Sequence, residues 1–119
     1  MRLLVLAAAL ATSPWVRAAG GPDCKAFEGF SDLQGSRVPG YQSEREVIGQ
    51  GRLYFHSSPY PKCRLPKLFI VPGDKVTAYV EFAGFTAVMY LNKKTGDDAM
   101  GWVESARLRV TGRGVSPRP

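Results

Sequence analysis

The fold is decided by residues 71–108, VPGDKVTAYVEFAGFTAVMYLNKKTGDDAMGWVESARL. The stretch begins with a Pro-Gly pair, Pro72 and Gly73, at the two central positions of a turn, which suits a type II geometry. Residues 75–82 then alternate between apolar and polar positions. This period of two predicts a strand whose core face carries Val76, Ala78 and Val80.

Two further strands are predicted from the residues that follow. Ala83-Gly84 interrupts the first strand, and residues 85–91 are rich in β-branched and aromatic side chains. The polar segment 92–98 predicts a hairpin tip, and the apolar run 101–103 predicts another strand. Residues 105–107 have room for one helical turn. Short alternating strands separated by turn residues indicate a small antiparallel all-β unit.

Four blocks of the chain resemble the bacterial SH3-like (SH3b) domain family, and they occur in the family's order. The blocks are residues 53–59 (LYFHSSP), 73–77 (GDKVT), 84–88 (GFTAV) and 101–103 (GWV) with Leu108. Ser58 replaces a glycine of the family pattern, and Phe85 replaces a tryptophan. The resemblance covers residues 52–110 and implies a single SH3-like β-barrel, a fold that hosts many functions.

The resemblance divides the chain into an arm, a barrel and a tail. Residues 19–51 contain several glycines and no persistent period, and we expect an irregular N-terminal arm. Within it, Ser43 and Glu46 have the spacing of a capping box, but the glycines that follow permit one helical turn at most. The barrel is expected over residues 52–110. The tail, residues 111–119, is rich in Gly, Pro and Arg and is expected to be disordered.

Residues 1–18 are predicted to be a secretory signal peptide. Met1-Arg2 is a basic start, residues 3–11 are apolar, and Val16 and Ala18 occupy the −3 and −1 positions of a cleavage site. The apolar run is well short of the ~20 residues of a membrane span, so no membrane insertion is expected after cleavage. We therefore expect the mature protein in the periplasm or outside the cell.

The chain is basic, with 16 Lys and Arg against 10 Asp and Glu and a net charge of +6. Loss of Arg2 and Arg17 with the signal peptide lowers the net charge to +4. The basic residues are scattered along the sequence, so most are expected to be solvated surface side chains. Export argues against nucleic acid as a partner. An anionic cell-wall polymer or an acidic protein remains as an alternative role for this charge.

Cys24 and Cys63 are the two cysteines of the chain. In an exported protein they are expected to form one disulfide, which would tie the arm to the loop after the first barrel strand. A free reactive pair or an intermolecular bridge is the alternative.

Candidate catalytic and metal-binding groups are few. His56 is the one histidine, and no nucleophile-elbow pattern accompanies it, so we expect a structural or surface role for it. Oxidised cysteines would leave no thiolate nucleophile. Asp97-Asp98 lacks the spacing of a calcium loop, and one His with two Cys does not supply a zinc site. We expect no enzymatic activity, no cofactor and no metal.

The aromatic residues are the candidates for a binding site. The resemblance places Phe85 in a shallow groove of the barrel, Tyr54 on its first strand and Tyr60 in the long loop that follows. These three side chains are expected to share one exposed face, with Glu81 or Asp74 at its rim. The alternative is that the same aromatic residues pack in the core and at its rim, in which case the partner would bind the basic loop of Lys62, Arg64 and Lys67.

The sequence therefore predicts a non-catalytic exported binding module. The leading hypothesis is a module that binds a protein partner, such as an inhibitor or immunity-type protein against an enzyme that acts on the cell wall. The alternative is direct binding of peptidoglycan, although SH3-like domains that do this usually accompany a hydrolase domain. An enzyme is the third alternative, and no feature of the sequence predicts a particular oligomeric state.

Overall fold

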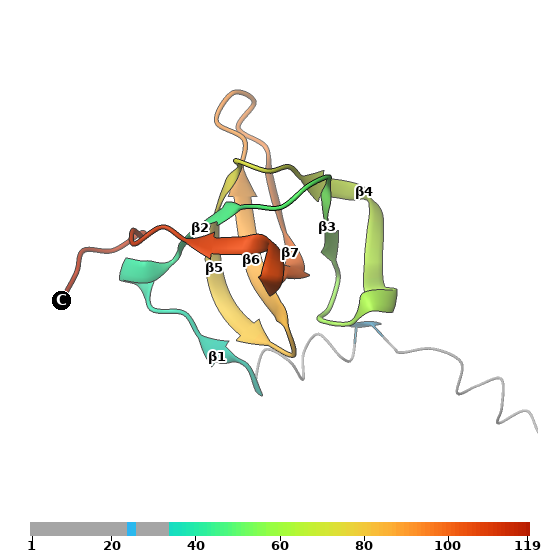
Figure 1. Cartoon of the computed structure of the whole chain (residues 1–119), viewed down its shortest axis with the longest axis horizontal. Coiled ribbons are helices and arrows are strands. Elements are labelled where there is room, and N and C mark those ends of the chain that lie inside the picture. The colour runs from blue at the N-terminus through green and yellow to red at the C-terminus, as the bar shows by residue number, and fades with distance from the viewer. Residues whose placement is uncertain (1–23, 26–33) are drawn as a thin grey trace, which may run out of the picture.

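The computed structural model describes residues 24–25 and 34–119. The predicted signal peptide lies outside these residues. One antiparallel sheet dominates the described part, and it curls into a half-barrel of the SH3-like kind (Figure 1), which confirms the expected all-β class. Its strands are β1 (Ser36–Arg37), β2 (Glu44–Val47), β3 (Leu53–His56), β4 (Arg64–Ile70), β5 (Lys75–Phe82), β6 (Phe85–Leu91), β7 (Asp98–Glu104) and β8 (Leu108–Val110).

The strand order is β4-β3-β7-β6-β5-β2-β8, and β1 pairs with β5 beside β2. Three short 3-10 helices connect the strands, η1 (Gly40–Gln42), η2 (Pro61–Cys63) and η3 (Ser105–Arg107). The β3–β4 hairpin projects from one side of the central strands β5, β6 and β7 (Figure 1). It is this hairpin that carries most of the site described below.

The turns of the central strands follow from their local sequence. Gly73 has φ 95°, and the Asp74 N–H donates to the Val71 carbonyl at 3.0 Å, as the predicted type II turn requires. Ala83 and Gly84 form a two-residue hairpin in which both φ angles are positive, at 55° and 84°. Such a turn matches the right-handed twist of the strands that it joins.

The barrel interior is filled by apolar side chains from six strands, β2 to β7, and β3 lies close to its neighbour β7. The buried set is Val47, Leu53, Phe55, Ile70, Val76, Ala78, Val88 and Val103. Gly101 makes the close approach of the strands possible, because a Cβ there would lie 2.9 Å from Phe55 Cδ2 and 3.0 Å from the His56 carbonyl oxygen. The glycine of the Gly-Trp-Val run is therefore required by packing rather than by an unusual backbone angle.

A β-bulge in β5 creates a second core on the outer face of the sheet. Ala78 pairs with Val88 but Val80 pairs with Ala87, so the register shifts between them. Paired side chains share a face, and the shift therefore moves Val80 to the face opposite Ala78. The prediction that both lie on one face was wrong. Val80 instead packs with Phe85 and Trp102.

The barrel begins earlier in the chain than expected, because the predicted irregular arm includes β2. This strand lies between β5 and β8, with Glu44 paired to Thr77 and Val47 paired to Leu108. Its buried Arg45 donates to the Gln42 carbonyl and lies 3.7 Å from the Glu81 carboxylate. β2 is stabilised by pairing with two neighbouring strands. Its own short, charged sequence therefore does not predict a strand.

The C-terminal tail is also more ordered than expected. The Glu44 N–H donates to the Arg113 carbonyl and the Val115 N–H donates to the Gly40 carbonyl, each at 2.9 Å. The Val115 N–H also donates to Ser43 Oγ at 3.2 Å. The tail through Val115 is thus held against η1 and β2, which corrects the prediction of disorder for that part.

Candidate binding site

The predicted aromatic residues do not share one exposed face. Tyr54 is half-buried and points out of the barrel, opposite to the buried Leu53 and Phe55, as predicted. Phe85 is only 7% exposed and belongs to the second core, so the prediction that it forms part of an exposed face was wrong. Tyr60 lies in the loop before η2, where its carbonyl accepts the Cys63 N–H.

The two carboxylates predicted at the rim make contacts away from Tyr54. Glu81 forms an ion pair with Arg45 at 3.7 Å. Asp74 accepts the Val71 N–H at 2.9 Å within its own turn. Neither residue lines the cavity that contains Tyr54.

Strand register brings a different set of side chains together on the outer face of the sheet. His56 is paired with Arg64 on β4 and with Trp102 on β7. Tyr54 is paired with Phe69 on β4. Continuing the antiparallel β3–β7 register by two residues places Glu104 beside Tyr54.

Two arginine side chains stack on the aromatic rings of this face. The Arg64 guanidinium lies 3.8 Å above the centroid of the Tyr54 ring, and the Arg52 guanidinium lies 4.3 Å above that of Phe69. The two rings are themselves in contact, with centroids 5.6 Å apart and planes inclined by 60°. Cation–π contacts of this kind hold a guanidinium in place and cover one of its faces.

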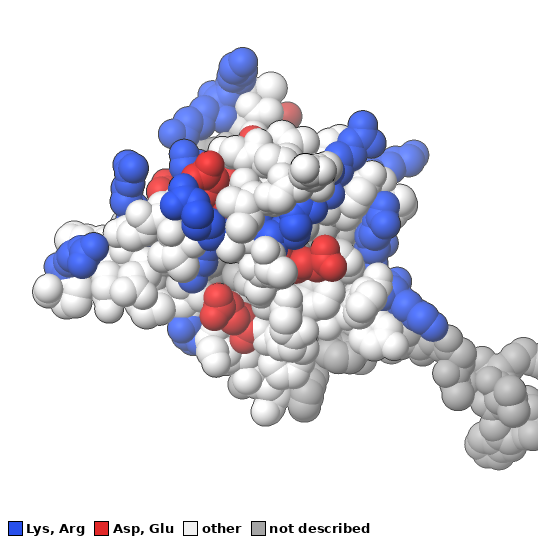
Figure 2. Space-filling view, viewed as in Figure 1, with Lys and Arg blue, Asp and Glu red and all other residues white. Residues whose placement is uncertain are grey.

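These side chains surround a shallow cavity of about 360 Å³, which we call the arginine–tyrosine pocket. Its lining residues are Arg52, Tyr54, His56, Pro61, Arg64 and Glu104. Figure 2 shows Lys and Arg side chains spread over the β3–β4 side of the molecule. Lys62 and Lys67 are exposed on η2 and β4, the elements that also contain the lining residues Pro61 and Arg64.

The positive charge of the pocket is not balanced by ion pairs. The three salt bridges of the described residues join Arg45 to Glu81, Arg109 to Glu46 and Arg113 to Glu44. None of them involves Arg52 or Arg64. Accordingly, the pKa of the Tyr54 phenol is lowered from its ordinary value, mainly by a hydrogen bond from Arg52 and further by the charges of both arginines.

His56 forms the floor of the pocket. His56 is 6% exposed, and its ring packs edge-on against Phe85, with centroids 4.9 Å apart. Nδ1 lies 3.2 Å from the Trp102 carbonyl oxygen, which can only accept, so Nδ1–H is the donor. Its burial and this hydrogen bond are those of a structural histidine.

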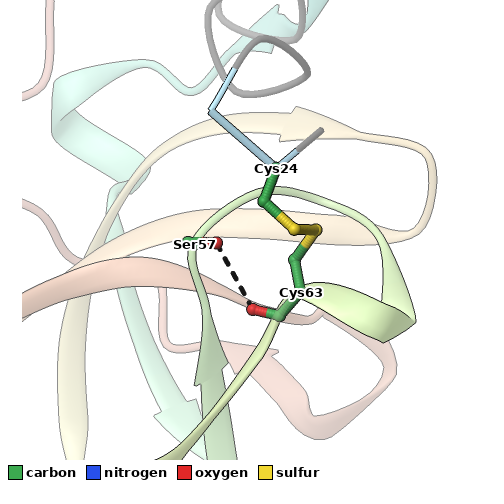
Figure 3. Close-up of a disulfide and its surroundings, with 3 residues drawn as sticks. All are labelled: Cys24, Ser57 and Cys63. Carbon is green, nitrogen blue, oxygen red and sulfur yellow. Dashed lines mark hydrogen bonds between the residues drawn. A yellow bond between two sulfur atoms is a disulfide. The ribbon is translucent and has the colours of Figure 1, made fainter. Parts of the chain in front are cut away.

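The loop that carries one wall of the pocket is held by a disulfide. The predicted Cys24–Cys63 bond is confirmed, and Figure 3 shows it beside Ser57. The Cys63 carbonyl accepts the Ser57 N–H at 3.0 Å and the Ser57 hydroxyl at 3.4 Å. Cys63 lies between Pro61 and Arg64, so these contacts limit the movement of two lining residues.

Of the six lining residues, only Tyr54 belongs to the predicted aromatic site, and Arg64 belongs to the alternative basic loop. The sequence analysis missed the other four, namely Arg52, His56, Pro61 and Glu104. The signal that could have found two of them is the alternation Arg52-x-Tyr54-x-His56, which places all three on one face of a strand. The basic residues were expected to be scattered, solvated surface side chains, so the alternation of Arg52 with Tyr54 and His56 was not recognised as a site. Arg64 and Glu104 come from other strands and could be added only through the pairing of the sheet.

A second cationic cavity, of about 450 Å³, lies near the β6–β7 hairpin tip and provides a comparison. Lys75, Lys93 and Lys94 line it together with Asp74. No aromatic ring in the described residues stacks on these lysines, in contrast to the arginines of the first pocket. In the described ranges, no cluster of His, Cys, Asp or Glu could hold a metal ion.

Comparison with known proteins yields no match to a family model, to a curated protein or to a solved structure. Residues 24–25 and 34–119 contain no helix that is long and apolar enough to cross a membrane. The disulfide is compatible with an extracellular location.

Proposed function

We propose that this protein is a non-catalytic, exported binding module that docks a protein partner through the outer face of its β3–β4 hairpin. The observation that carries the proposal is the pair Arg52 and Arg64, which are stacked on aromatic rings and lack carboxylate partners within the described residues. Arginine and tyrosine at the centre of a surface site typically contribute most of the binding energy of an interface.

Charge complementarity points to an acidic surface on the partner. Arg52, Lys62, Arg64 and Lys67 all belong to β3, β4 and the segments next to them, and Glu104 is the one carboxylate lining the pocket. Such an excess of one sign attracts an acidic surface and raises the rate of association. An inhibitor or immunity-type protein against an enzyme that acts on the cell wall fits these features.

The partner is expected to bind through side chains rather than by adding a strand to the sheet. β4 lies at the end of the strand order, so its outer edge has no neighbouring strand in the described part of the chain. However, the edge contains Pro66, which has no N–H, and Lys67, and the β3–β4 register is irregular between Tyr54 and His56. These features protect an edge from strand pairing.

The test is capture of the partner by immobilised protein from an envelope extract, with two charge-matched variants. Arg52→Gln/Arg64→Gln removes the proposed contact, whereas Lys93→Gln/Lys94→Gln removes the same charge at the second cationic cavity. We expect a defined protein to be captured by the wild type and the lysine variant but not by the arginine variant. Equal capture by both variants would refute the proposed face.

The same variants test direct binding of peptidoglycan. Sedimentation with purified peptidoglycan is expected to leave the wild-type protein in the supernatant. Sedimentation of the wild type together with loss of sedimentation in the arginine variant would replace the protein partner with the cell-wall polymer.

A further inference from the structure

We infer that the arginine–tyrosine pocket is a receptor for a single carboxylate, supplied by a glutamate or aspartate side chain of the partner, and that Glu104 selects it against phosphate. This inference rests on the proposed function, because it names the chemical group that the same face recognises. It adds a ligand class and a selectivity residue, and both can be tested without knowing the partner.

The geometry of the guanidinium groups favours a planar acceptor. Rings of Tyr54 and Phe69 cover one face of Arg64 and Arg52, respectively, at 3.8 and 4.3 Å. Each guanidinium has five N–H donors, so donors remain for a ligand beside the hydrogen bonds to the Tyr54 phenol, and a carboxylate accepts two such N–H groups in parallel. The stacked arginines are held before the ligand arrives, which lowers the entropy cost of binding.

The charge of the pocket favours an anion with one negative charge. Its fixed charges are the guanidinium groups of Arg52 and Arg64 and the carboxylate of Glu104, which leaves one positive charge. A carboxylate balances this charge. A phosphate group carries about −1.5 to −2 at neutral pH and would be left with unfavourable repulsion from Glu104.

The pocket has room for a glutamate or aspartate side chain of the partner. A cavity of about 360 Å³ lies at the lower end of the range for ligand sites, roughly 300–1,000 Å³. His56 lines its floor and packs against the buried Phe85. Tyr54 also lines the cavity, and its neutral hydroxyl can donate a hydrogen bond to the same carboxylate.

The test is an NMR titration of the Nε–H resonances of Arg52 and Arg64 in the folded protein. The probes are acetyl-Gly-Glu-Gly-amide, its matched control acetyl-Gly-Gln-Gly-amide, and inorganic phosphate, all at the same ionic strength. We expect the Glu peptide to shift both resonances, the Gln peptide to shift neither, and phosphate to bind more weakly than the Glu peptide. Equal shifts with the Gln peptide, tighter binding of phosphate or no shift with the Glu peptide would each overturn the inference.

Glu104→Gln tests the proposed selectivity, and because Glu104 is exposed, we expect this variant to fold as the wild type does. Removing one surface charge should improve binding of phosphate by about threefold more than binding of the Glu peptide. Unchanged relative affinities would overturn the role of Glu104.

The titration tests the carboxylate inference and partner capture tests the proposed function, so the failure of one can be distinguished from the failure of the other. A negative titration with partner capture that still depends on the arginines overturns the carboxylate inference alone. A positive titration without any captured partner supports the carboxylate site and overturns the proposed function.

Discussion

The imidazole of His56 lies edge-on against the phenyl ring of Phe85, with centroids 4.9 Å apart and ring planes inclined by 68°. His56 lines the arginine–tyrosine pocket, whereas Phe85 is buried beside Val80 and Trp102. The pocket is therefore supported from below by the second core. A change in that core is expected to act on binding through the fold rather than through contact with a ligand.

Phe85→Ala is expected to destabilise the protein, because it leaves a cavity in the second core. Truncation of a buried phenylalanine typically costs about 3–5 kcal/mol of unfolding free energy. Phe69→Ala is the matched control, since Phe69 is 37% exposed and stacks with Arg52. Urea denaturation should show a large loss for Phe85→Ala and a small one for Phe69→Ala. An unchanged midpoint for Phe85→Ala would contradict the assignment of this residue to the core.

The Tyr54 phenol is expected to ionise below its ordinary pKa of 10.0, because Arg52 hydrogen-bonds it and both arginines favour the phenolate. Absorbance of the phenolate as a function of pH measures this, with Tyr54→Phe identifying its contribution among the five tyrosines. Arg52→Gln should raise the pKa of Tyr54. Identical titration curves for the wild type and Arg52→Gln would show that the two side chains do not interact.

The sign of the linked pH effects follows from this lowered pKa. The folded protein binds the Tyr54 proton more weakly than the unfolded chain does. The contribution of the Tyr54 phenolate to folding stability is therefore complete above pH 10.0 and is lost as the pH falls through the pKa of Tyr54 in the folded protein. The phenolate also neutralises positive charge in the pocket. Binding of the Glu peptide should therefore weaken as pH rises through this pKa, and Tyr54→Phe should remove that pH dependence.

Loss of the Cys24–Cys63 disulfide is expected to destabilise the protein. The bond closes a loop with a sequence separation of 39, for which the chain-entropy model gives about 4 kcal/mol. Urea denaturation of Cys24→Ser/Cys63→Ser should show this loss, and the reduced wild type should match the variant. Added reductant should leave the double variant unchanged, and equal stability of the oxidised wild type and the variant would contradict the prediction.

Ala83→Gly is expected to stabilise the β5–β6 hairpin, because Ala83 has φ 55°. The left-handed conformation costs an L-residue roughly 1–2 kcal/mol, part of which is offset by the greater flexibility of glycine in the unfolded chain. Gly84→Ala is the control in the opposite direction, since Gly84 has φ 84°. Thermal unfolding should show a higher Tm for Ala83→Gly and a lower one for Gly84→Ala. A fall in Tm for Ala83→Gly would argue against strain at this turn.

Features that depend on neighbours in the chain were predictable from the sequence alone. The Pro72-Gly73 turn, the break at Ala83-Gly84 and the alternation of β5 up to Ala78 follow from the backbone preferences of these residues. The Cys24–Cys63 pairing followed from the presence of two cysteines in a chain expected to be exported. The all-β class followed from the same local patterns.

Features that depend on strand pairing were decided by the tertiary structure. A one-residue bulge in β5 moved Val80 to the outer face, and burial there of Phe85 replaced the expected exposed groove. The arginine–tyrosine pocket depends on the register between three strands, which brings Arg64 and Glu104 to Tyr54. Side-chain direction reverses with every residue along a strand, so a single inserted residue changes which side chains meet, and local sequence does not encode that shift.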